Sequence, residues 1–109
     1  MITKYKIFEK LNQGEPEEGD YVIMKFGSSD TEFVKFITNN IGKITEYRGK
    51  EKTHVRVKYL KDVPSDIKYM FNSGYDGDNT RQFLIRQIVY WSKDKKDLER
   101  VLKTKNYSL

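Results

Sequence analysis

The sequence predicts a mainly β domain of the α+β class: a small antiparallel barrel or bent sheet with a short inserted helix and a C-terminal helix. Three observations predict this class. Apolar residues alternate with polar ones, or run continuously, over strand-length segments that polar turn sequences separate. Eight tyrosines, six phenylalanines and one tryptophan supply bulky side chains for a small barrel. Residues 92–105 carry the charge order and apolar spacing of an amphipathic helix.

The length and composition fit one folded domain over residues 1–109. A chain of 109 residues buries about two thirds of its unfolded surface, which supports a single core. Aromatic residues make up 14% of the chain, which is too many for a disordered sequence. There is no cysteine and only one histidine, so neither a disulfide framework nor a zinc site is expected.

Two strands are expected in the N-terminal part. Thr3–Glu9 is the first, because Tyr5 and Ile7 alternate with lysines. A turn sequence rich in glycine and acidic residues follows over residues 12–20. Asp20–Lys25 is the second strand. Its continuous apolar run predicts burial on both faces, as in a central strand covered by a helix.

A short helix is expected over Thr31–Thr38. Phe33, Phe36 and Ile37 fall at the i, i+3 and i+4 spacing of one apolar helix face. The polar residues before this segment offer N-caps, and the two asparagines after it tolerate the conformation that ends a helix.

A β-hairpin is expected next, with strands over Ile41–Arg48 and Thr53–Tyr59 and a loop over residues 48–52. Side chains alternate between the two faces of a strand. In the second strand this alternation directs one set inward (Val55, Val57 and Tyr59) and the other outward (His54, Arg56 and Lys58).

Two further elements follow the hairpin. Pro64 stops its second strand, and Ser65–Phe71 is expected to form one or two helical turns before a polar loop over residues 72–79. Phe83–Trp91 is apolar almost throughout. It is expected to form a last strand, or two short strands broken near residues 86–87.

The C-terminal helix is expected over Lys93–Lys103, with Ser92 as its N-cap. Its acidic residues lie early and its basic residues late, as the helix dipole favours. The buried stripe of this helix is Leu98, Val101 and Leu102. The core expected for the whole domain is Ile7, Val22, Met24, Ile44, Val55, Val57, Ile88, Leu98 and Leu102.

Three short motifs follow one another along the chain in the order found in a known fold. They are Gly-Asp-Tyr-Val at residues 19–22, Asn-Ile-Gly-Lys-Ile at 40–44 and His-Val-Arg-Val-Lys-Tyr at 54–59. Over residues 19–60 this pattern resembles the SH3-like barrels of KOW-type domains. The resemblance implies a barrel in which a glycine allows a curved strand to approach its neighbour closely. The insertion at 27–39 departs from the simplest KOW pattern, and the size and composition also resemble short proteins of phages and mobile elements.

The basic charge is concentrated in one segment. Residues 41–61 hold seven basic and two acidic side chains, a net charge of +5, which equals the net charge of the whole chain. Clustered cations bind nucleic acid by releasing counterions from its phosphates, and nearby aromatic rings stack on bases. The sequence therefore predicts a site for nucleic acid or a ribonucleoprotein that comprises Tyr47, Arg48, Lys50, Lys52, Arg56, Lys58 and Tyr75.

Three other interpretations of this segment stay open. Lysines on an edge hairpin prevent edge-to-edge aggregation without any ligand. The same basic face also suits a protein-binding inhibitor of a host enzyme or defence complex, in the manner of phage inhibitors. A small phosphorylated ligand in the mouth of the barrel is the third alternative.

Catalysis, metals and cofactors are not expected. The chain has no cysteine nucleophile, no glycine-rich phosphate loop, and its one histidine, His54, lies among basic residues. Residues 76–79 resemble the start of a calcium loop, but Arg81 and Gln87 occupy positions that require glycine and glutamate. No apolar run is long enough for a signal peptide or membrane span, so a cytoplasmic location in a host cell is expected.

Overall fold

The computed structural model describes residues 11–27, 31–48, 53–71 and 79–107 of the chain. The expected first strand, Thr3–Glu9, and with it the expected core residue Ile7, lie outside these residues. The polar loop expected over 72–79 also lies outside them, apart from Asn79.

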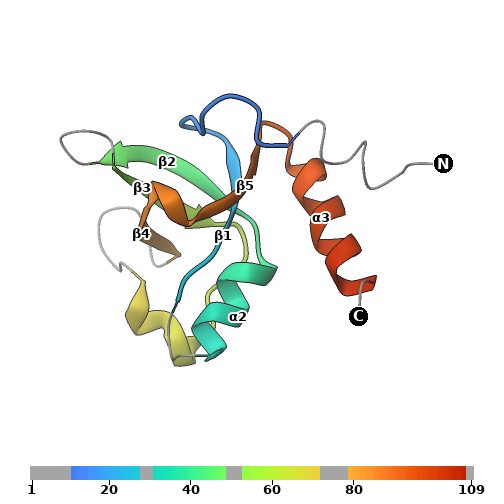
Figure 1. The fold of residues 1–109 in the computed structure, drawn as a ribbon. Coiled ribbons are helices and arrows are strands. Elements are labelled where there is room, and N and C mark those ends of the chain that lie inside the picture. The colour runs from blue at the N-terminus through green and yellow to red at the C-terminus, as the bar shows by residue number, and fades with distance from the viewer. Residues whose placement is uncertain (1–10, 28–30, 49–52, 72–78, 108–109) are drawn as a thin grey trace.

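The described chain folds into one antiparallel sheet of five strands with two α-helices, which confirms the prediction of a mainly β, α+β domain (Figure 1). The strand order across the sheet is β4-β3-β2-β1-β5. The strands are β1 (Tyr21–Met24), β2 (Gly42–Arg48), β3 (His54–Tyr59), β4 (Thr80–Leu84) and β5 (Ile88–Ser92). The helices are α2 (Thr31–Asn39) and α3 (Lys95–Tyr107), and two 3-10 helices are η1 (Ser65–Met70) and η2 (Ile85–Gln87).

The sheet is strongly bent, because a very short connection joins its two edges. The edge strands β4 and β5 are linked only by the three residues of η2. Five strands laid flat would separate the edges by about 19 Å at a strand spacing of about 4.8 Å. The chain from Leu84 to Ile88 spans at most about 14 Å. The sheet therefore curls toward closure, although β4 and β5 do not pair with each other.

Two irregularities in strand pairing contribute to the bend. The register shifts between Ile23 and Met24, where β1 pairs with β5, and between Ile44 and Glu46, where β2 pairs with β3. Such bulges insert an extra residue into one strand and increase its local twist. The second bulge also decides which way the side chains after it point.

Strand β1 separates two apolar clusters. Val22 and Met24 face the larger cluster, in which α2 and η1 pack on the inner side of the sheet. Ile23 faces the smaller cluster, which includes Leu98 and Val101 of α3. The continuous apolar run of β1 is therefore buried on both faces, as predicted. Of the expected core residues that are described, all are buried except Leu102, which is half-buried: Val22, Met24, Ile44, Val55, Val57, Ile88 and Leu98.

The helix α2 and the hairpin β2–β3 form where the sequence predicts them. The segment expected over Phe83–Trp91 instead begins at Thr80 and forms two strands, because η2 interrupts it at Ile85–Gln87. This is the second of the two alternatives that its sequence allowed.

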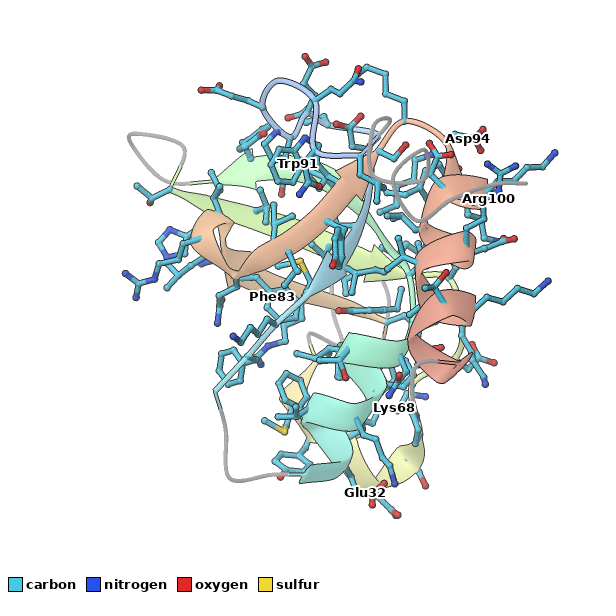
Figure 2. The ribbon with its side chains drawn as sticks, turned by 45° about the vertical axis from the view of Figure 1, so that its right-hand side comes forward. Glu32, Lys68, Phe83, Trp91, Asp94 and Arg100 are labelled. Atoms are coloured by element: carbon cyan, nitrogen blue, oxygen red, sulfur yellow. The ribbon has the colours of Figure 1, made fainter. Side chains whose placement is uncertain are left out.

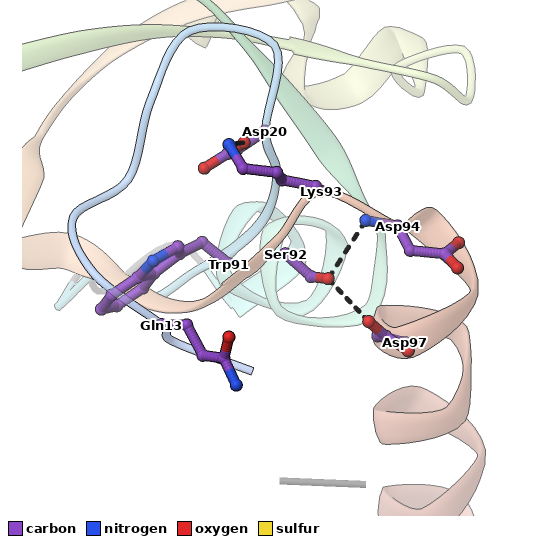
Figure 3. Close-up of a pocket in the computed structure, with 7 residues that line it drawn as sticks. All are labelled: Gln13, Asp20, Trp91, Ser92, Lys93, Asp94 and Asp97. Carbon is purple, nitrogen blue, oxygen red and sulfur yellow. Dashed lines mark hydrogen bonds and ion pairs between the residues drawn. The ribbon is translucent and has the colours of Figure 1, made fainter. Parts of the chain in front are cut away.

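The start of α3 differs from the prediction. Ser92 does not cap the helix, because its backbone belongs to β5 and is paired with Tyr21. Asp94 takes that role: its carboxylate accepts a hydrogen bond from the N–H of Lys96 at 2.9 Å, and α3 begins at Lys95. The Ser92 hydroxyl accepts a bond from the Asp94 N–H and donates one to Asp97 (Figure 3). Figure 2 shows Asp94 at the N-terminal end of α3.

Candidate functional site

The hairpin β2–β3 presents a charged face on the outer side of the sheet. Cross-strand pairing sets Lys43 opposite Lys58, Glu46 opposite Arg56, and Arg48 opposite His54. The intervening pairs face the inner cluster. We call the outward set Lys43, Glu46, His54, Arg56 and Lys58 the outer hairpin face.

Two lysines lie directly opposite each other on this face. The side chains of Lys43 and Lys58 are both exposed, and their strands are adjacent. The Lys43 ammonium lies 5.5 Å from the ring centroid of Tyr21. Within the described ranges, no carboxylate forms an ion pair with either lysine. Like charges placed directly opposite destabilise a sheet, so the fold carries this pair at a cost.

Lys58 belongs to the predicted site, whereas Lys43 was counted only in the net charge of the segment. The signal that could have found it is the register of the predicted hairpin. With the loop centred on residues 49–52, counting back along both strands brings Lys43 near Lys58.

Arg56 does not have the exposed position expected of it. Its residue is only 8% exposed, and its Nε lies 3.8 Å from Oε1 of Glu46. The reason is the neighbouring strand: β4 pairs with β3 and sets Gln82 beside Arg56, so β3 is an interior strand. Arg56 therefore lies on the outer side as predicted, but the prediction that it is exposed to solvent is wrong.

The same topology corrects a second expectation. One interpretation of the sequence was an edge hairpin whose lysines prevent edge-to-edge aggregation. Among the described strands the edges of the sheet are β4 and β5, whereas β2 and β3 both have neighbours on each side. Protection of a sheet edge therefore does not account for Lys43 and Lys58.

Tyr47 lies on the opposite side of the hairpin from the lysines. It pairs with Val55 and packs in part against the inner cluster. Its backbone N–H donates to Oε1 of Glu18 at 3.3 Å. Burial, and then the nearby carboxylates of Asp20 and the acidic turn before it, raise the pKa of its hydroxyl. The structure thus places Tyr47 beside acidic groups and not beside the lysines of the outer hairpin face.

The remaining predicted residues are only partly described. The backbone of Arg48 ends β2 opposite His54. The half-buried His54 ring has its Nδ1 2.8 Å from the Thr53 hydroxyl. Lys50, Lys52 and Tyr75 lie outside the described residues, as does most of the candidate calcium loop.

An acidic corner lies where the first turn meets the start of α3. It comprises Glu17, Asp20, Asp94 and Asp97, with Lys93 among them. Figure 3 shows all of these except Glu17. The Lys93 ammonium bonds Oε2 of Glu17 at 3.2 Å and Oδ1 of Asp20 at 3.3 Å, and these two hydrogen bonds raise its pKa. Asp20 also accepts a bond from the Glu17 N–H at 2.9 Å. A hollow of about 220 Å³ here is lined by Gln13, Asp20, Trp91, Ser92, Lys93, Asp94 and Asp97.

A third charged group, Arg81, is used inside the fold. Its guanidinium carbon lies between 4.8 and 5.3 Å from the ring centroids of Phe26, Phe33 and Phe83. One of its nitrogens donates to the Met70 carbonyl at 2.6 Å. Burial lowers the pKa of this guanidinium. Figure 2 shows Phe83 in the interior, and Arg81 caps this aromatic group by cation–π contact.

Within the described ranges, no three acidic or histidine side chains gather closely enough to hold a metal ion. The helices found there are too short or too polar to cross a membrane. The chemistry that the outer hairpin face does offer is the binding of anions. The backbones of Lys43 and Lys58 are about one strand spacing, roughly 5 Å, apart. Ammonium groups such as theirs bind phosphates as point charges. Comparison with protein-family models, curated proteins and solved structures finds no significant match to this chain.

Proposed function

We propose that this protein is a non-enzymatic binding module that engages nucleic acid or a ribonucleoprotein through the outer hairpin face. The observation that carries this proposal is the exposed Lys43–Lys58 pair, which faces solvent on two adjacent interior strands. Within the described chain neither ammonium pairs with a carboxylate, and that of Lys43 lies over the Tyr21 ring. A polyanion would remove the repulsion between the two lysines, and the fold would recover the cost of holding them together.

The geometry predicts how such binding would depend on sequence and salt. Lysine–phosphate contacts fix position without distinguishing bases. The exposed ring expected for base stacking, Tyr47, lies on the other side of the hairpin. Arg48 ends β2, Lys50 and Lys52 follow it in the sequence, and we propose that all three add to the basic charge available to a ligand. We therefore propose binding that tolerates many sequences and falls steeply with salt.

The finer fold belongs to the same proposal: an SH3-like barrel. Gly42 supports it, because a Cβ at this position would collide with Cγ1 of the Val57 side chain, so there is no room for a larger residue at this point of β2. The short η2 connection between the two sheet edges supports it as well. The composition supports a role in a phage or mobile element, acting in the cytoplasm of a host cell.

The test is fluorescence anisotropy with labelled single-stranded and duplex oligonucleotides over a salt series. The variant is Lys43→Ala with Lys58→Ala, and the matched control is Lys25→Ala with Lys35→Ala, which removes the same charge from exposed lysines elsewhere. Each lost phosphate contact should lower the slope of log affinity against log salt by about 0.7–0.9. The control should keep most of the affinity.

Two results would overturn the proposal. One is an equal loss of affinity in the variant and the control, which would show a general effect of net charge. The other is no binding by the unaltered chain even at low salt. Either result would favour the alternative function, a protein-binding inhibitor of a host enzyme or defence complex.

A further inference from the structure

A second surface feature lies at the base of the hairpin. The end of α2, the residues just before β2 and just after β3, and one side of α3 line a groove of about 240 Å³. Three apolar side chains line it: Ile41 is buried, Leu102 is half-buried and Leu60 is 48% exposed. The backbone N–H of Leu60 bonds the carbonyl of Ile41, which brings these two residues together beyond the last pair of the hairpin. We call this the hairpin-base groove.

The exposure of Leu60 is the first sign that the groove is a contact surface. Only Leu60 and Tyr69 are exposed large hydrophobic residues in the described chain, and Leu60 is the one beside a hollow with further apolar walls. Exposed apolar surface with a polar rim is typical of interaction sites. Pockets for small molecules commonly measure about 300–1,000 Å³. This groove is smaller, so it suits one large side chain of a partner.

The charges around the groove define the partner further. Lys61 and Lys95 line it, and no acidic residue does. Lys95 lies 3.6 Å from Glu99 one turn along the helix, but both side chains are about half exposed. Such surface pairs are weak, so a partner carboxylate can compete for this ammonium.

The end of α2 contributes polar acceptors to the groove. The side-chain amide nitrogen of Asn39 bonds the Lys35 carbonyl, and that of Asn40 bonds the Phe36 carbonyl, each at 2.8 Å. These bonds hold the two side chains against the helix end. They leave the amide oxygens of both asparagines as acceptors for a partner's backbone N–H groups.

We infer that the hairpin-base groove binds an acidic protein segment that inserts one large apolar side chain against Leu60. The basic rim matches the carboxylates of such a segment, and the apolar walls match its anchor. A nucleic acid fits less well, because no aromatic side chain lines the groove and phosphate gains nothing from Leu60. This inference is independent of the proposed function of the outer hairpin face.

The experiment is an NMR titration of the ¹⁵N-labelled full chain with three capped heptapeptides. The probe has the sequence Gly-Glu-Asp-Leu-Glu-Asp-Gly. One comparison peptide replaces its leucine by alanine, and the other replaces its four acidic residues by lysine. The probe should shift the backbone signals of Leu60, Lys61 and Leu102. The alanine peptide should bind about tenfold more weakly or worse, since the buried leucine is lost. The lysine peptide should produce no shift.

Variants of the protein separate this mode from general attraction. Leu60→Asp should abolish the probe's shifts, whereas the control Tyr69→Asp, at a residue 76% exposed on η1, should leave them intact. Reversing the rim with Lys61→Glu and Lys95→Glu should weaken the probe by about tenfold and make the lysine peptide bind instead. A dispersed spectrum for each variant confirms its fold.

Four results would overturn the inference: no shift at millimolar probe, equal binding of the leucine and alanine peptides, undiminished binding to Leu60→Asp, and groove shifts that appear with protein concentration alone. The last would assign the groove to a second copy of this chain. A labelled oligonucleotide that shifts the same groove signals would also overturn it, by making the groove part of a nucleic-acid surface.

Discussion

The charged side chains of the acidic corner attract one another, whereas the two opposed lysines of the outer hairpin face repel each other. In the acidic corner, Lys93 bridges Glu17 and Asp20, and the buried Asp97 accepts a hydrogen bond from Ser92 at 2.7 Å. On the outer hairpin face, Lys43 and Lys58 stand opposite each other with no such partner in the described chain. The first arrangement joins a turn to a helix and supports folding. The opposed lysines destabilise the fold, and this difference supports the proposal of a ligand at the hairpin.

The largest expected effect tests whether α3, which carries Asp97 of the acidic corner, is docked on the sheet. Leu98 is fully buried against Ile23 and Ile41. Leu98→Ala should lower the free energy of unfolding by about 2–5 kcal/mol, as truncations of buried leucine do. Urea denaturation measures this, with the exposed Lys103→Ala on the same helix as the control. A loss no greater than that of the control would show that the helix contributes nothing to the corner.

A smaller effect of opposite sign is expected on the outer hairpin face. Lys58→Glu replaces a repulsive cross-strand pair by an attractive one, so it should stabilise the fold by about 0.2–1 kcal/mol. The same change should weaken polyanion binding. Lys93→Glu is the matched comparison, because it sets a third carboxylate against Glu17 and Asp20 and should destabilise. If both substitutions shift the melting temperature in the same direction, the contrast between the two regions is wrong.

The smallest effect concerns alkaline pH. Its hydrogen bonds raise the pKa of Lys93 above the unfolded value. A raised pKa means that the folded state holds this proton more tightly. The stabilisation is therefore complete below the ordinary lysine pKa of the unfolded chain and is lost as pH rises through the higher folded pKa. The difference in unfolding free energy between the unaltered chain and Lys93→Met should shrink over this range. It should also be smaller in high salt, because Lys93 is exposed. A difference that stays constant would show that the bridge is not formed in solution.

Much of the fold could be predicted from local pattern. The apolar run of β1 indicated burial on both sides, and the spacing of Phe33, Phe36 and Ile37 indicated α2. These features depend only on the spacing of apolar residues within one strand or helix. The hairpin β2–β3 and the division of the last apolar segment into two strands were also within reach, because turn sequences mark nearly every boundary of these elements.

The candidate site was predicted less well, for two physical reasons. Simple alternation from the inward Ile44 would turn Tyr47 outward, but the bulge between Ile44 and Glu46 adds one residue and turns it inward. Arg56 is buried because β4 pairs with β3, and strand neighbours are a long-range property. The sequence near Arg56 contains no sign of Gln82. The same limit applies to Ser92, whose pairing with Tyr21 decides that Asp94 caps α3.

The strand order also has a consequence for biosynthesis. The first described strand, β1, has the last strand, β5, as one of its two neighbours. While the chain emerges from a ribosome, β5 cannot pair with β1 until synthesis has passed Ser92. The pairing of β1 with β5 closes a long loop, which is entropically costly and therefore slow. A chain that stops at η2 would expose the edge of β1, together with the apolar Ile23 that α3 normally covers, to other nascent chains.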